Sequence, residues 1–154
     1  MASTRTVLFI GTAAGLIGGA VELVPILPIQ GALGVSPLRV FQSIASGLLG
    51  RDAYGGGWGS GLLGIACHFL IAVGAGVAYA LAAARMPLLR RRPLAMGALY
   101  GVAVYAFMNW VVVPLSAVAF APTSDPAMMA LSLAIHIFAF TIPIALFVRR
   151  RLAG

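Results

Sequence analysis

The sequence predicts an all-α membrane protein with four transmembrane helices and one short interfacial or re-entrant helix. Hydrophobic residues make up 62% of its 154 residues and charged residues only 8%, whereas soluble domains carry about 25% charged residues. The mean hydropathy is correspondingly high, at +1.06. Four apolar stretches each approach the ~20 residues needed to cross a bilayer. At this length, the four spans predict a single domain covering residues 1–154.

The four spans are expected at residues 6–28, 59–84, 93–119 and 126–148. The first is interpreted as a retained span, because a secretory signal has an apolar core of only about 7–15 residues. Pro93 and Pro126 are expected in the first turns of their helices. A backbone N–H at that position has no partner within the helix, so its absence in proline costs nothing. Asp125 is placed to cap the helix that follows it.

Between the first two spans, residues 37–49 predict a shorter helix that begins after Ser36. Apolar runs of about 10–14 residues are typical of interfacial or re-entrant segments rather than spans. The amphipathic spacing favours an interfacial helix, with a re-entrant one as the alternative. If the segment dips inward, Arg39 and Gln42 are its possible contributors to an interior site.

The basic residues are all arginines, and they predict the orientation of the chain. Most fall on the side that carries both termini, whereas Arg39 and Arg51 fall on the other. Since Arg and Lys accumulate on the cytoplasmic side, both termini are expected in the cytoplasm. Two triplets are interpreted as anchors and as candidate contacts for lipid headgroups: Arg90, Arg91, Arg92, Arg149, Arg150 and Arg151. Because the charge lies at span ends, no nucleic-acid partner is expected despite a net charge of +7.

A strongly polar residue lies near the middle of each apolar stretch, and together these are the candidate site: Glu22, His68, Asn109 and His136. Such groups are expensive in hydrocarbon and usually face a bundle interior. Helical rise places all four at similar depths. Small residues, such as Gly15 and Gly19 in the first span, share the same faces and favour close helix packing. We therefore predict that the four side chains converge.

The chemistry of such a layer stays open at this stage. A carboxylate and two imidazoles can relay protons. They are also an acceptable ligand set for a divalent metal, but no spacing motif supports one and no metal site is assigned. Two histidines at one depth could also be the axial ligands of haem b, here His68 and His136. The single cysteine, Cys67, excludes an internal disulfide and a cysteine-based metal cluster. Alternatively, the histidines and Asn109 only join helices by hydrogen bonds worth about 0.6 kcal/mol each.

Three blocks of the chain carry a resemblance: SPLRVFQSIASGLLG (36–50), LGIACHF (63–69) and MNWVVVPLS (108–116). Together they resemble a family of small bacterial four-helix inner-membrane proteins of unknown function. The resemblance covers most of the chain and implies a polytopic membrane protein. It implies no activity, substrate or catalytic residue.

The leading functional hypothesis is binding or conduction of a proton, an ion or a small solute at the polar layer, with Glu22 as the titrating group. The alternatives are a haem-bearing electron carrier and a non-catalytic subunit of a larger complex. No catalytic residue is assigned, and an enzyme is the least favoured class, because the loops carry few reactive side chains. Four short spans enclose little volume, so we expect a homo-oligomer or an accessory position in a larger membrane complex.

Overall fold

A computed structural model describes residues 3–118 and 125–152. Within these ranges every regular element is helical. Four helices are long and apolar enough to cross a membrane: Thr4–Ala32, Gly57–Arg85, Pro93–Leu115 and Pro126–Leu152. They correspond to the four expected spans, although most extend a few residues further. The expected end of the third span, residue 119, lies outside the described residues.

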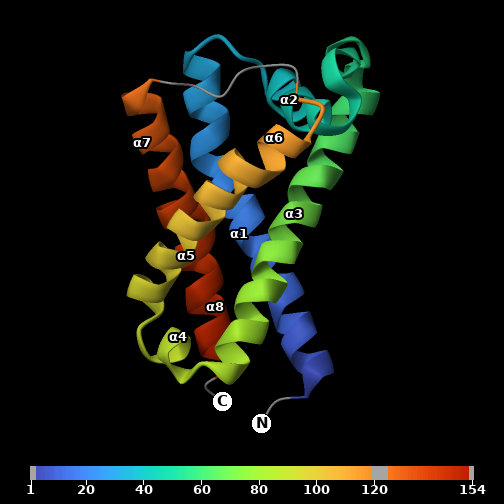
Figure 1. Ribbon diagram of the computed structural model, residues 1–154. Helices are drawn as coiled ribbons and strands as arrows, with labels where there is room; N and C mark the ends of the chain where they lie inside the picture. The colour runs from blue at the N-terminus through green and yellow to red at the C-terminus, as the bar shows by residue number, and fades with distance from the viewer. Residues whose placement is uncertain (1–2, 119–124, 153–154) are drawn as a thin grey trace.

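The first half of the chain forms α1 (Thr4–Ala32), α2 (Pro37–Leu49), the short 3₁₀ helix η1 (Gly50–Gly55), α3 (Gly57–Arg85) and α4 (Pro87–Arg91). The hydroxyls of Ser3 and Ser36 accept the first free N–H groups of α1 and α2. Both chain termini lie at one end of the bundle, beside α4 (Figure 1). We call this the terminal end, and the opposite end, which carries α2, the distal end.

The second half of the chain forms two long helices that each contain a π-helical segment. The third long helix consists of α5 (Pro93–Phe107), the π-helical η2 (Met108–Val112) and α6 (Val113–Leu115). The fourth consists of α7 (Pro126–Ile135), the π-helical η3 (His136–Thr141) and α8 (Ile142–Leu152). As predicted, the Asp125 carboxylate caps the fourth helix by accepting the N–H of Ala127 at 2.9 Å.

Prolines account for both π-helical segments. Pro114 and Pro143 each stand two residues beyond the end of η2 and η3. A proline offers no N–H, and its ring collides with the carbonyl four residues earlier, here those of Trp110 and Ala139. Widening the preceding turn relieves that collision, and such π-bulges are frequent at functional sites. Asn109 and His136, two of the predicted site residues, lie in these segments.

Glycines allow α1 and α3 to cross at backbone contact. A Cβ on Gly11 would lie 2.6 Å from Cα of Val77, and one on Gly15 would lie 2.6 Å from Cα of Val73. Gly76 of α3 faces the same crossing, against Gly15. No larger residue fits at these positions without moving a helix, as expected for small-residue faces that let membrane helices approach.

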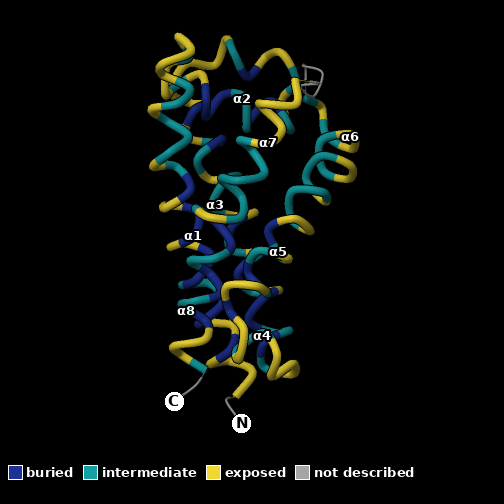
Figure 2. Tube along the Cα trace, turned by 90° about the vertical axis from the view of Figure 1, so that its left-hand side faces the viewer, coloured by how far each residue is buried: buried dark blue, intermediate teal, exposed yellow. Residues whose placement is uncertain are grey.

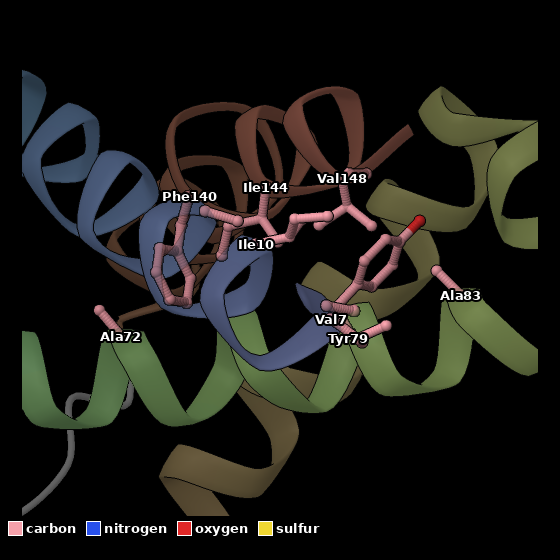
Figure 3. Packing of buried hydrophobic residues seen from close by; sticks show 11 residues of the cluster. Val7, Ile10, Ala72, Tyr79, Ala83, Phe140, Ile144 and Val148 are labelled. Atoms are coloured by element: carbon pink, nitrogen blue, oxygen red, sulfur yellow. The ribbon is translucent and has the colours of Figure 1, made fainter. Parts of the chain in front are cut away.

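The apolar core lies in the terminal half of the molecule, where α1 is held between α3 and α8 (Figure 3). Tyr79 of α3 and Ile144 and Val148 of α8 are fully buried there, and Val7 and Ile10 of α1 fill the space between them (Figure 3). Buried positions become sparser toward the distal end, apart from those on α2 (Figure 2). The distal half is therefore the part with room for a cavity.

The third and fourth helices cross near their middle and separate distally, so that α6 and α7 stand apart in both views (Figures 1 and 2). At the crossing, the Thr141 hydroxyl donates to the carbonyl of Gly97 at 2.8 Å. Gly101 lies against the same threonine and Ile137. In contrast, α3 and α5 barely touch, and the Tyr100 hydroxyl bridges them by donating to the Ala75 carbonyl at 2.8 Å.

Helix α2 packs by its apolar face on the distal part of α3. Val40, Phe41 and Ala45 are buried on this face, and Gly64 of α3 lies against the Phe41 carbonyl. The end of α2 is joined to the chain beyond α6, because the N–H of Ala117 donates to the Gly47 carbonyl at 2.9 Å. The segment expected at 37–49 is therefore a helix that packs on the bundle and covers its distal half.

Candidate functional site

A cavity of about 630 Å³ occupies the distal half, between α1, α2, α3 and η3. Its inner end carries three of the predicted site residues: Glu22, His68 and His136. Its mouth carries polar side chains near the distal end: Gln30, Arg39, Ser43 and Tyr54. Most of the remaining lining is aliphatic. From Glu22 to Gln30, α1 advances eight residues, which sets the depth of the cavity at roughly 12 Å.

Glu22 is the most unusual group in this cavity, because it is buried without a hydrogen-bond donor. Only 7% of the residue is exposed. Among the described residues, the nearest charged or ionisable atom to its carboxylate is Nε2 of His136, at 4.0 Å from Oε1. That separation is too long for a direct hydrogen bond. The Glu22 oxygens nevertheless keep some accessible surface, because no fully enclosed side-chain oxygen of the described residues lacks a partner. A proton or a ligand in the cavity can therefore reach the carboxylate.

The ring of His136 is oriented by its own helix. Its Nδ1 lies 2.8 Å from the carbonyl of Ser132, one turn earlier. A carbonyl can only accept, so Nδ1 carries the proton and Nε2 of the neutral ring is an acceptor. Tyr105 packs edge-on against the imidazole, with ring centroids 5.6 Å apart. The π-helical turn that begins at His136 thus directs Nε2 toward Glu22.

Two acceptors therefore face each other at the inner end of the cavity. A carboxylate oxygen of Glu22 and a neutral imidazole nitrogen of His136 repel unless a donor lies between them. Three arrangements satisfy both groups: a protonated Glu22, a protonated His136, or a bound group that donates N–H or O–H bonds to both.

His68 contributes to the same end of the cavity from α3. Its Nε2 donates to the carbonyl of Gly19 at 2.9 Å, and Gly19 is one helical turn before Glu22. Phe69 packs edge-on against the ring, with centroids 5.1 Å apart. His68 is therefore held at the contact between α1 and α3, and its Nδ1 is the remaining acceptor of the neutral ring.

Asn109, the fourth predicted site residue, does not line this cavity. Its side-chain amide donates to the carbonyl of Tyr105 on its own helix, at 2.9 Å. This bond satisfies one of the two N–H groups of the amide within a single helical turn. The structure brings together Glu22, His68 and His136 but not Asn109.

Of the two possible contributors from α2, Arg39 lines the cavity and Gln42 does not. Arg39 lines the mouth of the cavity, with its guanidinium carbon 5.0 Å from the centre of the Tyr54 ring. The amide of Gln42 donates to the Gly57 carbonyl at 3.1 Å and to the Ser60 hydroxyl at 3.3 Å. Gln42 therefore fastens α2 to α3, and Arg39 alone belongs to the cavity.

The arginine triplets lie at the terminal end, far from the cavity. Arg90 has a structural role, since its guanidinium donates to the carbonyls of Ala83 and Ala84. These carbonyls belong to the last turns of α3, where helices lack internal donors. Arg91 and Arg92 are exposed, as are the three arginines that begin at Arg149.

The cofactor hypothesis from the sequence can be compared with this geometry. Axial ligation of haem b through Nε2 of both histidines would require His68 to release the Gly19 carbonyl, whereas its Nδ1 is not engaged in that bond. Of the two rings, only that of His136 presents Nε2 toward Glu22. In the described part of the chain, no three His, Cys, Asp or Glu side chains are grouped so that they could hold a metal ion.

Several residues that shape the site carry no assigned role in the sequence prediction. Tyr105 and Ser132 share the helical faces of Asn109 and His136. Of the mouth, only Arg39 is predicted to contribute, whereas Gln30, Ser43 and Tyr54 are not. The two π-helical segments had a visible signal in Pro114 and Pro143, each near a polar residue. The rest of the mouth had none, because it forms only when α2 packs across the bundle.

Searches against protein-family models, curated proteins and solved structures gave no match.

Proposed function

We propose that this chain is an integral membrane protein that binds a small proton-donating or cationic solute at Glu22 and His136, and that it exchanges a proton at the same place. The observation that carries the proposal is the pair of unsatisfied acceptors at the inner end of the cavity. Their atoms lie 4.0 Å apart and face a space of about 630 Å³. A donor placed between them would satisfy both.

Binding is favoured over free conduction, because the cavity ends at Glu22. The cavity extends from the distal surface, where Gly34 and Arg39 are exposed at its rim, to Glu22 at its inner end. Beyond Glu22, the terminal half is closed by packed side chains, including Ile144 and Val148 with no exposed surface. A continuous path would require these helices to separate.

The orientation that we propose follows from charge. The terminal end carries both termini and most of the arginines, whereas Arg39 and Arg51 lie distally. The positive-inside rule favours a cytoplasmic terminal end in a bacterial inner membrane. In that orientation the cavity faces the outside, and solutes reach Glu22 without crossing the packed core.

Infrared difference spectroscopy of the protein in lipid nanodiscs tests the proposal. Acidification should produce the carbonyl band of a protonated carboxyl group in a low-polarity environment. Glu22→Gln should remove this band. Asp52→Asn is the matched control, since Asp52 is an exposed carboxylate of η1 that lies outside the cavity, and it should leave the band in place.

The proposal is overturned if no band assignable to Glu22 changes across the pH range in which the protein stays folded. A carboxyl group that never exchanges its proton with the aqueous phase would be a structural group. The alternative of an accessory subunit, which the sequence left open, would then be favoured.

A further inference from the structure

A second cavity, of about 550 Å³, lies beside the first, between α3 and the helix formed by α5 and η2. Three residues line both cavities: Ile71, Val104 and Met108. The two spaces are therefore neighbours that share one wall. We refer to the second one as the lateral groove.

The lateral groove exists because α3 and α5 diverge. These two helices barely contact one another, and Tyr100 bridges them toward the terminal end. On the α3 side, the groove is lined from Ile71 to Ala78, a length of roughly 10 Å at the usual helical rise. Gly74 is open, with no atom within 4 Å of the position that a Cβ would occupy.

The chemistry of the groove differs from that of the site beside it. None of the described residues that line it is charged, and the one hydroxyl among them, that of Tyr100, donates to the Ala75 carbonyl. In a bilayer such a surface accepts hydrocarbon and gives no reason for a polar molecule to enter. The groove therefore fits the apolar part of a molecule whose polar end lies at Glu22.

The charges at the site favour a cation as the polar end of the ligand. Glu22 and Nε2 of His136 are acceptors without donors, and an ammonium group offers three N–H donors and one positive charge. An anion would be repelled by the buried carboxylate. At the mouth, the exposed Arg39 disfavours cations that arrive from water, whereas the lateral groove has no such barrier.

We infer that the ligand of this site is a lipophilic amine that enters from the bilayer through the lateral groove. Its ammonium passes between the side chains of Ile71, Val104 and Met108, which divide the two spaces. The ammonium then lies between Glu22 and His136, and the apolar chain stays between α3 and α5. The inference rests on the proposed function and adds the class of ligand and its route. No covalent step is involved.

The test measures binding of octylammonium to the protein in nanodiscs, after subtraction of its partition into empty nanodiscs. Octanol has the same chain without the charge and should bind at least about tenfold more weakly, because hydrogen bonds to charged groups are the stronger ones. Glu22→Gln should weaken octylammonium binding by a similar factor. Asp52→Asn should not.

Two glycine variants of α3 test the route. Gly74→Leu fills the lateral groove and should weaken octylammonium binding by roughly tenfold, the range expected when packing loses a few contacts. Gly59→Leu is the control, since Gly59 also has open space around it but lines neither cavity. It should leave the affinity unchanged.

Several results would overturn the inference. Equal binding of octanol and octylammonium would remove the role of charge, and equal affinity in Gly74→Leu would remove the groove. A change in the mass of the Gly74→Leu assembly by native mass spectrometry, with the affinity unchanged, would show that a second copy of the chain covers the groove. If Glu22 still exchanges its proton while no octylammonium binds, the proposed function stands and this inference fails.

Discussion

Glu22 lines the cavity, but no described residue donates a hydrogen bond to its carboxylate. The carboxylate is 7% exposed, yet its only described ionisable neighbour within 4.0 Å is an imidazole nitrogen that is itself an acceptor when neutral. By contrast, Asn109 and His68 each have a backbone carbonyl as a partner. The three residues therefore differ in what their removal should cost.

We predict that His68→Leu lowers the free energy of unfolding by about 0.6 kcal/mol, the average for a hydrogen bond between membrane helices. It should leave the infrared band of Glu22 in place, since the lost bond is to Gly19 and not to the carboxylate. Unfolding in mixed micelles measures the first quantity. A loss of several kcal/mol would mean that His68 holds α1 and α3 together far more strongly than one bond can.

Asn109→Leu is expected to change neither the stability by more than about 0.5 kcal/mol nor the Glu22 band. The amide bonds only to its own helix and does not line the cavity. The same two measurements apply. An altered Glu22 band in this variant would restore Asn109 to the site.

At the scale of elements, the position of α2 depends on one close approach. Gly64 of α3 lies against the Phe41 carbonyl, so that any side chain at this position would displace α2. Because α2 carries Arg39 and covers the cavity, its seating determines the shape of the mouth.

We predict that Gly64→Ala costs about 1–3 kcal/mol, as overpacking typically does, and that it increases the distance between spin labels on α2 and α3. Gly74→Ala is the matched control, because open space surrounds Gly74 on the same helix. It should be neutral or slightly stabilising, since alanine favours a helix over glycine. Equal effects of the two variants would contradict the close approach.

The π-helical segment η3 is the second determinant at this scale. It adds about one residue to a turn ahead of Pro143, and this addition rotates everything before it by about 100° relative to a regular helix. The Thr141 hydroxyl lies 2.8 Å from the Gly97 carbonyl and 2.9 Å from the His136 carbonyl, so its one proton is shared between the helix crossing and the widened turn.

Pro143→Ala restores an N–H and removes the ring, so a regular α-helix becomes possible. We predict that His136 then rotates away from Glu22. Spin labels on cysteines introduced at positions 22 and 136, in a chain with Cys67→Ala, should lie closer together with Pro143 than with alanine there. Equal distances would indicate that the tertiary contacts alone hold the π-helical turn.

At the scale of the whole molecule, the bundle has a packed terminal half and a more open distal half (Figure 2). The candidate site lies in the distal half. Close backbone contact joins α1 to α3 through glycines, while the separation of α6 from α7 leaves the distal half open (Figure 1). The proposed orientation directs this open half away from the cytoplasm.

Cysteine labelling in whole cells tests that orientation. In a chain with Cys67→Ala, a cysteine at Gly31 near the distal end should react with a membrane-impermeant maleimide. A cysteine at Arg91 should react only after the cells are opened. Both positions are exposed, so a difference reports sidedness; the reverse pattern would place the termini outside.

Much of the fold followed from composition and local pattern. The apolar stretches indicated four long helices, Ser36 with Pro37 indicated the start of α2, and Asp125 indicated a cap. Each of these depends on residues close together in sequence. The convergence of Glu22, His68 and His136 was also predictable, because a polar residue in the middle of an apolar membrane helix usually faces the interior of the bundle.

The remaining features required tertiary structure. Whether Asn109 reaches the cavity depends on a π-helical turn and on the tilt of its helix, and neither follows from spacing. Arg39 and Gln42 belong to the same short helix, but only its docking on Gly64 decided that Arg39 faces the cavity and Gln42 faces α3. The sequence by itself determined which segments are helical and apolar, since that depends on local hydrogen bonding and hydropathy. Only packing decided which side chains share a space, since that depends on where separate backbones touch.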